Sequence, residues 1–120
     1  MVLVDTSVWV SHLRDGNTEL ATLLNNGTVL CHPLIVGELA CGNLKDRAVI
    51  LSFLRLLPMC IEAEHEEVLS FIENNRIMGK GIGYVDAQLV ASSVLTGVPI
   101  WTLDKKLAQV ADSLHIKYKN

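Results

Sequence analysis

The 120-residue sequence is poor in several residue types, and each shortage excludes a class of protein. Aromatic residues make up only 5% of the chain, so the predicted core is aliphatic. The three cysteines, Cys31, Cys41 and Cys60, are an odd number without CxxC spacing, which excludes a disulfide framework and favours a reducing compartment. Ten Lys and Arg against thirteen Asp and Glu leave a net charge of −3. This charge excludes a strongly basic nucleic-acid-binding protein, although not a local basic patch.

No segment of the sequence is typical of a membrane or secreted protein. The N-terminus lacks the basic start of a signal peptide. The longest apolar stretch, residues 48–61, is interrupted by Ser52, Arg55 and Pro58 and is too short to span a bilayer. Half of the residues are hydrophobic, and this chain length suits one compact domain over residues 1–120. We therefore expect a cytoplasmic protein that makes no contact with a membrane.

Short apolar runs alternate with segments of helical periodicity along the whole chain. Strands are predicted at residues 2–4, 28–32 and 99–103, with shorter ones at 59–61 and 115–118. The helices predicted between them cover residues 8–13, 20–24, 34–41, 45–57, 64–78 and 85–96, with a last helix through Leu107, Val110 and Leu114. This alternation predicts a three-layer α/β/α fold with a central parallel sheet of four or five strands.

Four of the thirteen acidic residues stand in apolar surroundings. Asp5 and Asp104 each end a predicted strand, Glu38 is the one charge in its helix, and Asp86 begins a helix whose next ten residues are uncharged. A buried carboxylate is costly unless another group compensates for it. The other nine acids are typical of solvated surface charges. Each of the four, taken alone, also fits a helix cap or an ion pair.

The predicted topology brings these four acids to one edge of the sheet. In an open α/β sheet, the carboxyl ends of the strands and the N-termini of the following helices face the same crevice. Carboxylates about 5 Å apart repel by about 3 kcal/mol at an effective dielectric constant near 20, so the group must take up protons or hold a cation. Oxygen ligands without clustered His or Cys favour Mg²⁺ or Mn²⁺, ions that mostly serve phosphate chemistry. Thr6 or Ser7 is expected to add a hydroxyl, although Thr6 also fits a plain helix cap.

The sequences around the four acids resemble motifs of the PIN-domain nucleases. The motifs are Val-Leu-Val-Asp-Thr-Ser at 2–7, Val-Gly-Glu-Leu at 36–39, Gly-Tyr-Val-Asp-Ala at 83–87 and Ile-Trp-Thr-Leu-Asp at 100–104. Their order and the chain length are most similar to VapC-type toxins of bacterial toxin–antitoxin modules. The resemblance covers essentially the whole chain.

The resemblance implies a PIN-like domain that acts as an endoribonuclease dependent on Mg²⁺, with Mn²⁺ as a substitute. It implies that Asp5, Glu38 and Asp86 hold the metal, that Asp104 supports it or a second ion, and that Thr6 supplies the small hydroxyl. It further implies RNA as the substrate, a cognate antitoxin protein that blocks the site, and a homodimer. One departure is visible, because Lys105-Lys106-Leu107 stands where many relatives have another acid followed by Phe.

Three lysines flank the acid-bearing segments, and we expect them to contact the RNA backbone: Lys80, Lys105 and Lys106, with Arg14, Lys45 and Arg47 as weaker candidates. Each also fits an ordinary solvated surface charge. The main alternative function is a catalytically inactive PIN-like module that binds RNA or protein, which loss of one of the acids would indicate. A receiver domain or an aspartyl phosphatase fits less well, because no acid lies within residues 48–61 and Ser7 stands where the phosphatase needs a second Asp.

Overall fold

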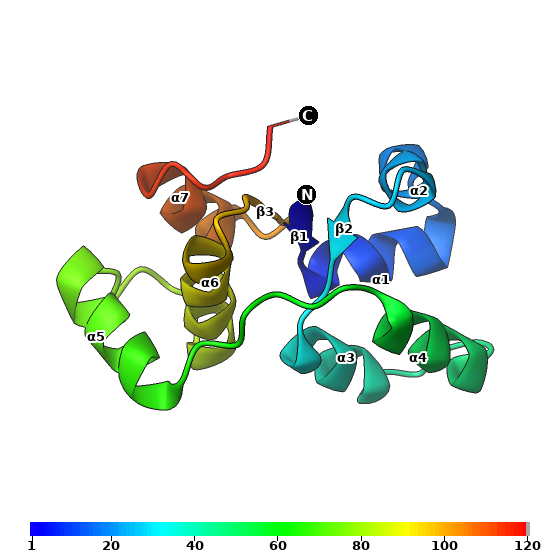
Figure 1. Cartoon of the computed structure of the whole chain (residues 1–120), viewed down its shortest axis with the longest axis horizontal. Helices are drawn as coiled ribbons and strands as arrows, with labels where there is room; N and C mark the ends of the chain where they lie inside the picture. Colours follow the sequence, from blue (N-terminus) through cyan, green and yellow to red (C-terminus); the bar gives the residue numbers. More distant parts are fainter. Residues whose placement is uncertain (120) are drawn as a thin grey trace.

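The structure is a computed structural model that describes residues 1–119. Three parallel strands form its sheet in the order β2-β1-β3, with β1 (Val2–Val4) in the centre between β2 (Val29–Leu30) and β3 (Ile100–Trp101) (Figure 1). Every residue of the three strands is buried. A parallel strand covered on both faces requires a continuous apolar run, which explains the sequence Val-Leu-Val at the centre of the sheet.

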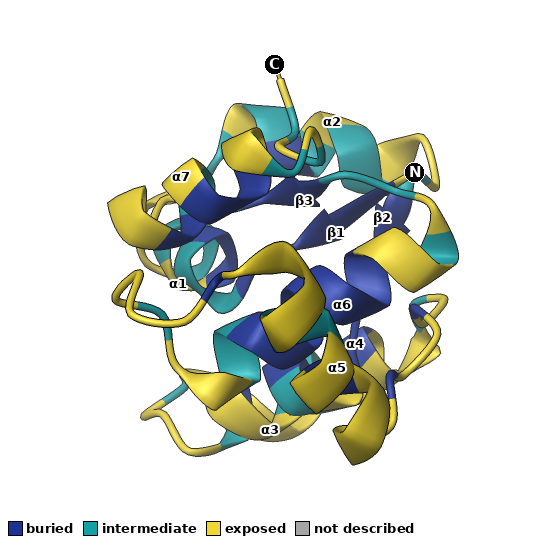
Figure 2. Ribbon diagram, turned by 90° about the vertical axis from the view of Figure 1, so that its left-hand side faces the viewer, coloured by how far each residue is buried: buried dark blue, intermediate teal, exposed yellow. Residues whose placement is uncertain are grey.

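Helices cover both faces of this sheet, as the alternation of elements predicts. The described residues form α1 (Thr6–Asp15), α2 (Thr18–Asn25), α3 (Pro33–Ala40), α4 (Arg47–Leu56), α5 (His65–Asn75), α6 (Tyr84–Thr96) and α7 (Lys105–Ser113). Figure 2 shows α2 and α7 above the sheet and α3, α5 and α6 below it. Within residues 1–119, no helix has both the length and the apolar character needed to cross a bilayer.

The buried side chains form two groups, and both are mainly aliphatic. The larger group surrounds the sheet and includes the aromatic side chains of Trp9 and Trp101. The smaller one joins α5, α6 and α7 through residues such as Val68, Ala87 and Val110. Figure 2 shows the buried strands and the buried side of α6 facing each other. The aliphatic core expected from the composition is therefore confirmed.

The sheet has three strands among the described residues, so the prediction of four or five is wrong. Residues 59–61 contribute a single bridge, Cys31 to Met59, closed by hydrogen bonds from Cys31 N–H to Pro58 O and from Cys60 N–H to Cys31 O, each 2.9 Å long. To extend this parallel pairing toward the C-terminus, the N–H of residue 33 would have to donate the next hydrogen bond. To extend it toward the N-terminus, the N–H of residue 58 would have to donate. Both are prolines without an N–H, so the pairing cannot extend.

The predicted strand at residues 115–118 is likewise a single bridge, between Ile100 and Lys117. The preceding rung would need the N–H groups of Val98 and Ile116. These groups instead donate to Ser93 O at 3.1 Å and to Ala111 O at 2.9 Å, at the ends of α6 and α7. Helix termination thus uses the donors that a longer strand would need.

Candidate active site

Asp5 lies at the carboxyl end of β1 and begins α1. Its backbone is extended, with φ −69° and ψ 157°, and its side chain accepts a hydrogen bond from the Ser7 N–H, as an N-cap residue does. The residue is only 5% exposed. The change from an apolar strand to a helix therefore places one carboxylate at the edge of the core, as the sequence predicts.

Two hydroxyl groups fix the orientation of the Asp5 carboxylate. Its Oδ2 accepts from Ser7 Oγ at 2.7 Å and from Thr102 Oγ1 at 2.8 Å. The Ser7 hydroxyl accepts from the Leu103 N–H at 2.9 Å, and the Thr102 hydroxyl accepts from the Asp104 N–H at 3.0 Å. Each hydroxyl has a single proton and donates it to Asp5. Both of these hydrogen bonds reach the same carboxylate oxygen, Oδ2. Within residues 1–119 no hydrogen bond engages the other oxygen, Oδ1, which can receive a ligand.

Glu38 is joined to the first acid through the neighbouring residue Thr6. The Thr6 hydroxyl donates to Glu38 Oε1 at 2.7 Å, which links the start of α1 to α3. Helix α3 begins directly after β2, because His32 caps it and Pro33 occupies its first turn. The cap of α1 is Asp5, so Thr6 is not the helix cap but a residue that orients the second acid.

Asp104 and Asp86 lie at the starts of the two helices that flank β3. Asp104 caps α7 by accepting the Leu107 N–H at 2.9 Å through Oδ1. Asp86 is in the first turn of α6 and is half-buried. Burial raises the pKa of the Asp86 carboxyl, the charges of Asp5, Asp104 and Glu38 raise it further, and a hydrogen bond from the backbone of Gly83 opposes these effects. The charges of the other three acids thus act on the Asp86 carboxyl.

Among residues 1–119, no basic side chain forms an ion pair with these four acids. An ion pair at 3.0 Å joins Arg14 to Asp15 elsewhere on the surface. Within the same part of the chain, no three His, Cys, Asp or Glu side chains are arranged tightly enough to hold a metal ion. In the acid cluster, defined as Asp5, Glu38, Asp86 and Asp104, Asp86 is therefore within electrostatic range of the other three acids, although the four do not converge on one point.

Thr102 is not among the residues predicted from the sequence, although its hydroxyl donates to Asp5 and accepts from the backbone N–H of Asp104. The available signal was a polar side chain at the end of an apolar strand, two residues before an acid. Of the lysines expected to contact RNA, Lys80 and Lys106 line one cavity of about 440 Å³, whereas Lys105 is exposed at the first residue of α7.

The sequence matches the PIN domain family over residues 2–113. It is 44% identical over 108 residues to a protein named Ribonuclease VapC32 in two strains of Mycobacterium tuberculosis, CDC 1551 / Oshkosh and ATCC 25618 / H37Rv. Each match covers 89% of this chain and 87% of the relative.

The fold is similar to that of two solved structures of lower sequence identity. FitAcB from Neisseria gonorrhoeae matches with a TM-score of 0.65 and 22% identity, over 93% of this chain and 94% of that one. FitAB bound to an IR36 DNA fragment matches with a TM-score of 0.64 and 18% identity, over the full length of both chains. The family match, the identity to the mycobacterial relatives and the order of strands and acids together show that the chain belongs to the PIN-domain family.

Proposed function

We propose that residues 1–120 form a single nuclease domain that hydrolyses RNA phosphodiester bonds with the help of a divalent metal ion. The observation that carries this proposal is the acid cluster, in which three carboxylates from separate segments raise the pKa of Asp86 and none of the four has an ion-pair partner among residues 1–119. Asp5 is buried and Asp86 half-buried, whereas Glu38 and Asp104 are exposed, so the cost of an uncompensated charge falls mainly on Asp5 and Asp86. The 44% identity to proteins named Ribonuclease VapC32 supports RNA as the substrate.

The chemistry of the donors fits Mg²⁺, with Mn²⁺ as a substitute. All four cluster members are carboxylates, and hard divalent ions prefer oxygen ligands. Asp5, Glu38 and Asp86 would hold the ion, with Asp104 supporting it or a second ion. When bound, such an ion activates water for attack and neutralises charge on the phosphate.

The protein itself orients the ligands, and one backbone contact opposes the rise in the pKa of Asp86. Ser7 and Thr102 hold Asp5 by one oxygen, so its other oxygen has a fixed direction. Thr6 holds Glu38 in the same way through a 2.7 Å hydrogen bond. The Gly83 backbone stabilises the ionised form of Asp86 against burial and the neighbouring charges. These contacts reduce the rearrangement that metal binding requires.

We also propose that the nuclease is the toxin of a toxin–antitoxin module, blocked by a cognate antitoxin and paired as a homodimer. Its similarity to a VapC protein supports this assignment. Helix α4 offers an apolar surface for such contacts, because Val49, Phe53 and Leu56 are 69%, 42% and 84% exposed.

Cleavage of bulk RNA tests the enzymatic proposal. We expect cleavage with Mg²⁺ or Mn²⁺, none with EDTA, and at least a roughly 100-fold loss in Asp5→Asn, because the substitution removes a ligand charge. Asp112→Asn is the matched control, since Asp112 is an exposed acid of α7 outside the acid cluster. Cleavage that persists in EDTA, or an Asp5→Asn protein as active as the wild type, would contradict the proposal.

A further inference from the structure

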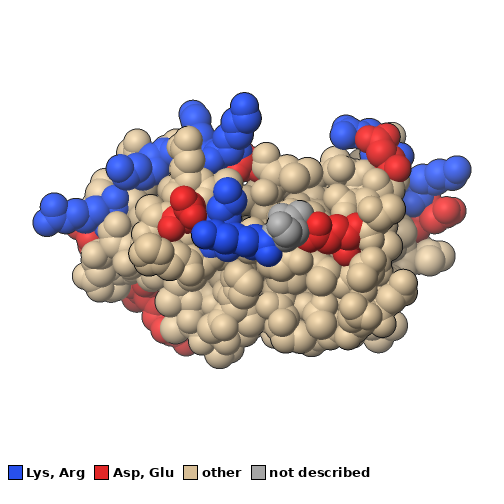
Figure 3. Space-filling view, turned by 90° about the horizontal axis from the view of Figure 1, so that it is seen from above, with Lys and Arg blue, Asp and Glu red and all other residues tan. Residues whose placement is uncertain are grey.

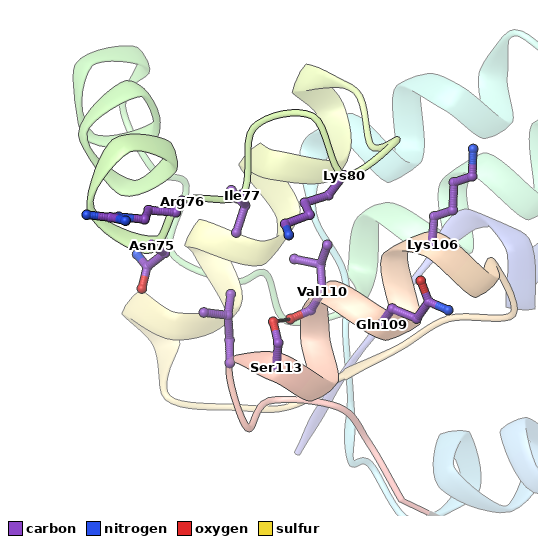
Figure 4. Close-up of a pocket in the computed structure, with 9 residues that line it drawn as sticks. Asn75, Arg76, Ile77, Lys80, Lys106, Gln109, Val110 and Ser113 are labelled. Atoms are coloured by element: carbon purple, nitrogen blue, oxygen red, sulfur yellow. Dashed lines mark hydrogen bonds between the residues drawn. The ribbon is translucent and has the colours of Figure 1, made fainter.

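A cavity of about 440 Å³ lies beside the acid cluster, between the end of α5, residues 76–80 and α7 (Figure 4). Three of its lining residues are cations, Arg76, Lys80 and Lys106, and none is acidic. Such a lining is notable in a chain whose net charge is −3. Seen from above, Lys and Arg side chains gather over the half of the molecule that contains α5 and α7 (Figure 3).

The three cations lie at the cavity without ion-pair partners among residues 1–119. Figure 4 shows Lys80 extending across the cavity toward Val110, whereas the charged ends of Arg76 and Lys106 point outward on opposite sides of it. All three side chains are exposed. Lys80 can therefore contact an anion inside the cavity, and Arg76 and Lys106 can contact a chain that continues past its rim.

The cavity is linked to the acid cluster through α7, although none of the four acids lines it. Lys106 follows the cluster member Asp104 by two residues in the first turn of α7. Its side chain packs against Gly81, where an added Cβ would lie 2.5 Å from Lys106 Cδ. Gly81 has φ +81°, a conformation that glycine adopts without strain, so it permits this close approach. The contact connects the loop that carries Lys80 to the helix that begins at Asp104.

The remaining lining residues suit a nucleobase. Gln109 contributes an exposed amide to the lining, the amide oxygen of Asn75 and the hydroxyl oxygen of Ser113 can accept hydrogen bonds, and the nearly buried side chains of Ile77 and Val110 form the apolar floor. Single-stranded RNA is recognised by hydrogen bonds to base edges and by contacts with base faces, and its phosphates are held by Lys and Arg. The acid cluster itself repels phosphate, so a strand that crosses it needs cations beside it.

We propose that this cavity binds the nucleotide next to the cleaved bond in single-stranded RNA, with Lys80, Lys106 and Arg76 contacting its phosphates. The inference rests on the proposed ribonuclease function and adds a substrate subsite to it. An acidic protein segment would satisfy the cations but not require a position beside the acid cluster, and the experiment below separates the two ligands.

Binding of a fluorescent, single-stranded oligoribonucleotide in EDTA tests the subsite without cleavage. We compare the double variant Arg76→Gln/Lys80→Gln with Arg55→Gln/Lys119→Gln, which removes two exposed cations outside the cavity. The cavity variant should bind roughly tenfold more weakly at low salt, and its salt dependence should fall by about 0.7 in slope for each lost phosphate contact. The control should match the wild type in both, and all three proteins should unfold at the same temperature.

The outcomes separate this inference from the proposed function. With Mn²⁺, the cavity variant should lose cleavage of the oligoribonucleotide but retain cleavage of bis(p-nitrophenyl) phosphate, which has no neighbouring nucleotide. If the wild type cleaves RNA and the cavity variant binds and cleaves it equally well, the subsite is wrong and the nuclease stands. If the cavity variant loses affinity for a polyglutamate peptide but not for RNA, the cavity is a protein-binding site and the inference is wrong. If the wild type cleaves neither substrate, the proposed function is wrong, and the EDTA binding comparison still decides on the subsite.

Discussion

The acid cluster and the polar network inside the protein both consist of polar side chains, but they differ in burial and in bonding partners. The polar network comprises His32, Ser92 and Gln88, which join α3 to α6 beneath the sheet. Its side chains are buried and bonded to one another, whereas the carboxylates of the acid cluster are mutually repulsive and lack basic partners among residues 1–119. Groups that only stabilise a fold are expected to be satisfied. The carboxylates of the cluster accept hydrogen bonds but have no ion-pair partner among residues 1–119, as expected of a site for a cation.

The hydrogen bonds of the polar network determine which ring nitrogen of His32 carries the proton. The Leu34 N–H donates to His32 Nδ1 at 3.0 Å, so the ring proton is on Nε2 and points to Ser92 Oγ at 3.1 Å. The Ser92 hydroxyl donates to Gln88 Oε1 at 3.0 Å and accepts the Ala63 N–H at 3.2 Å. Gln88 Nε2 in turn donates to Ala63 O at 2.7 Å. His32 is thus held neutral, and burial lowers its pKa.

The largest effect is expected when the support of the acid cluster is removed through Thr102→Val. Asp5 then loses one of its two hydroxyl donors, and loss of such an outer contact typically reduces metal affinity or activity by about 10–100-fold. RNA cleavage is measured as a function of Mn²⁺ concentration. The cleavage activity of Thr102→Val should partly recover at high Mn²⁺. Thr102→Ser, which keeps the hydroxyl, should recover most of the activity. A Thr102→Val protein with wild-type Mn²⁺ dependence would show that Thr102 does not position Asp5.

The polar network should respond to substitution with a loss of stability and not of metal binding. Ser92→Ala leaves three buried partners without a hydrogen bond and should lower the free energy of unfolding by about 1–3 kcal/mol. Urea unfolding measures this loss. The folded variant should bind Mn²⁺ with wild-type affinity, and a weaker affinity would show that the network and the acid cluster are coupled.

A smaller effect is expected when pH is lowered. The folded pKa of His32 lies below the unfolded value of 6.5, so the unfolded chain takes up a proton first as the pH falls. The stabilisation is complete above about pH 6.5 and is lost as the pH falls toward the folded pKa. Unfolding free energies at several pH values measure this loss. His32→Asn keeps a capping side chain without a titrating group and should flatten the curve between pH 6.5 and the folded pKa. An unchanged curve would assign the pH dependence to other groups.

The smallest effect is the stabilisation that Asp86→Asn should give in EDTA. The raised pKa of Asp86 means that its charge opposes folding once the carboxyl ionises, so stability from this residue is highest at low pH and is lost as pH rises through the folded pKa. Removing the charge should raise the free energy of unfolding at neutral pH by at most about 1 kcal/mol, because water screens a half-buried group. Added Mn²⁺ should stabilise the variant less than the wild type. An Asp86→Asn protein that unfolds in EDTA would identify Asp86 as a structural residue.

The sequence made the positions of three acids predictable, because Asp5 and Asp104 each follow a strand and Asp86 lies in the first turn of a helix. Glu38 instead lies toward the end of α3, so only its apolar neighbours single it out in the sequence. The sheet was less predictable, since strand length depends on which N–H groups remain available. Pro33 and Pro58 both remove donors beside the Cys31 bridge, and this only becomes apparent once the register is known. A local pattern marks Thr102 as a polar residue at a strand end, but it does not show that the contact partner is Asp5, 97 positions away.

The most direct test of the account is a titration of Mn²⁺ into the wild type and Asp5→Asn, followed by the electron paramagnetic resonance of the free ion. If the acid cluster forms a metal site, the wild type should take up Mn²⁺ and Asp5→Asn should do so with an affinity lower by roughly 10–100-fold or more. Equal uptake by the two proteins, or no uptake by the wild type, would contradict the assignment of these carboxylates to a metal ion.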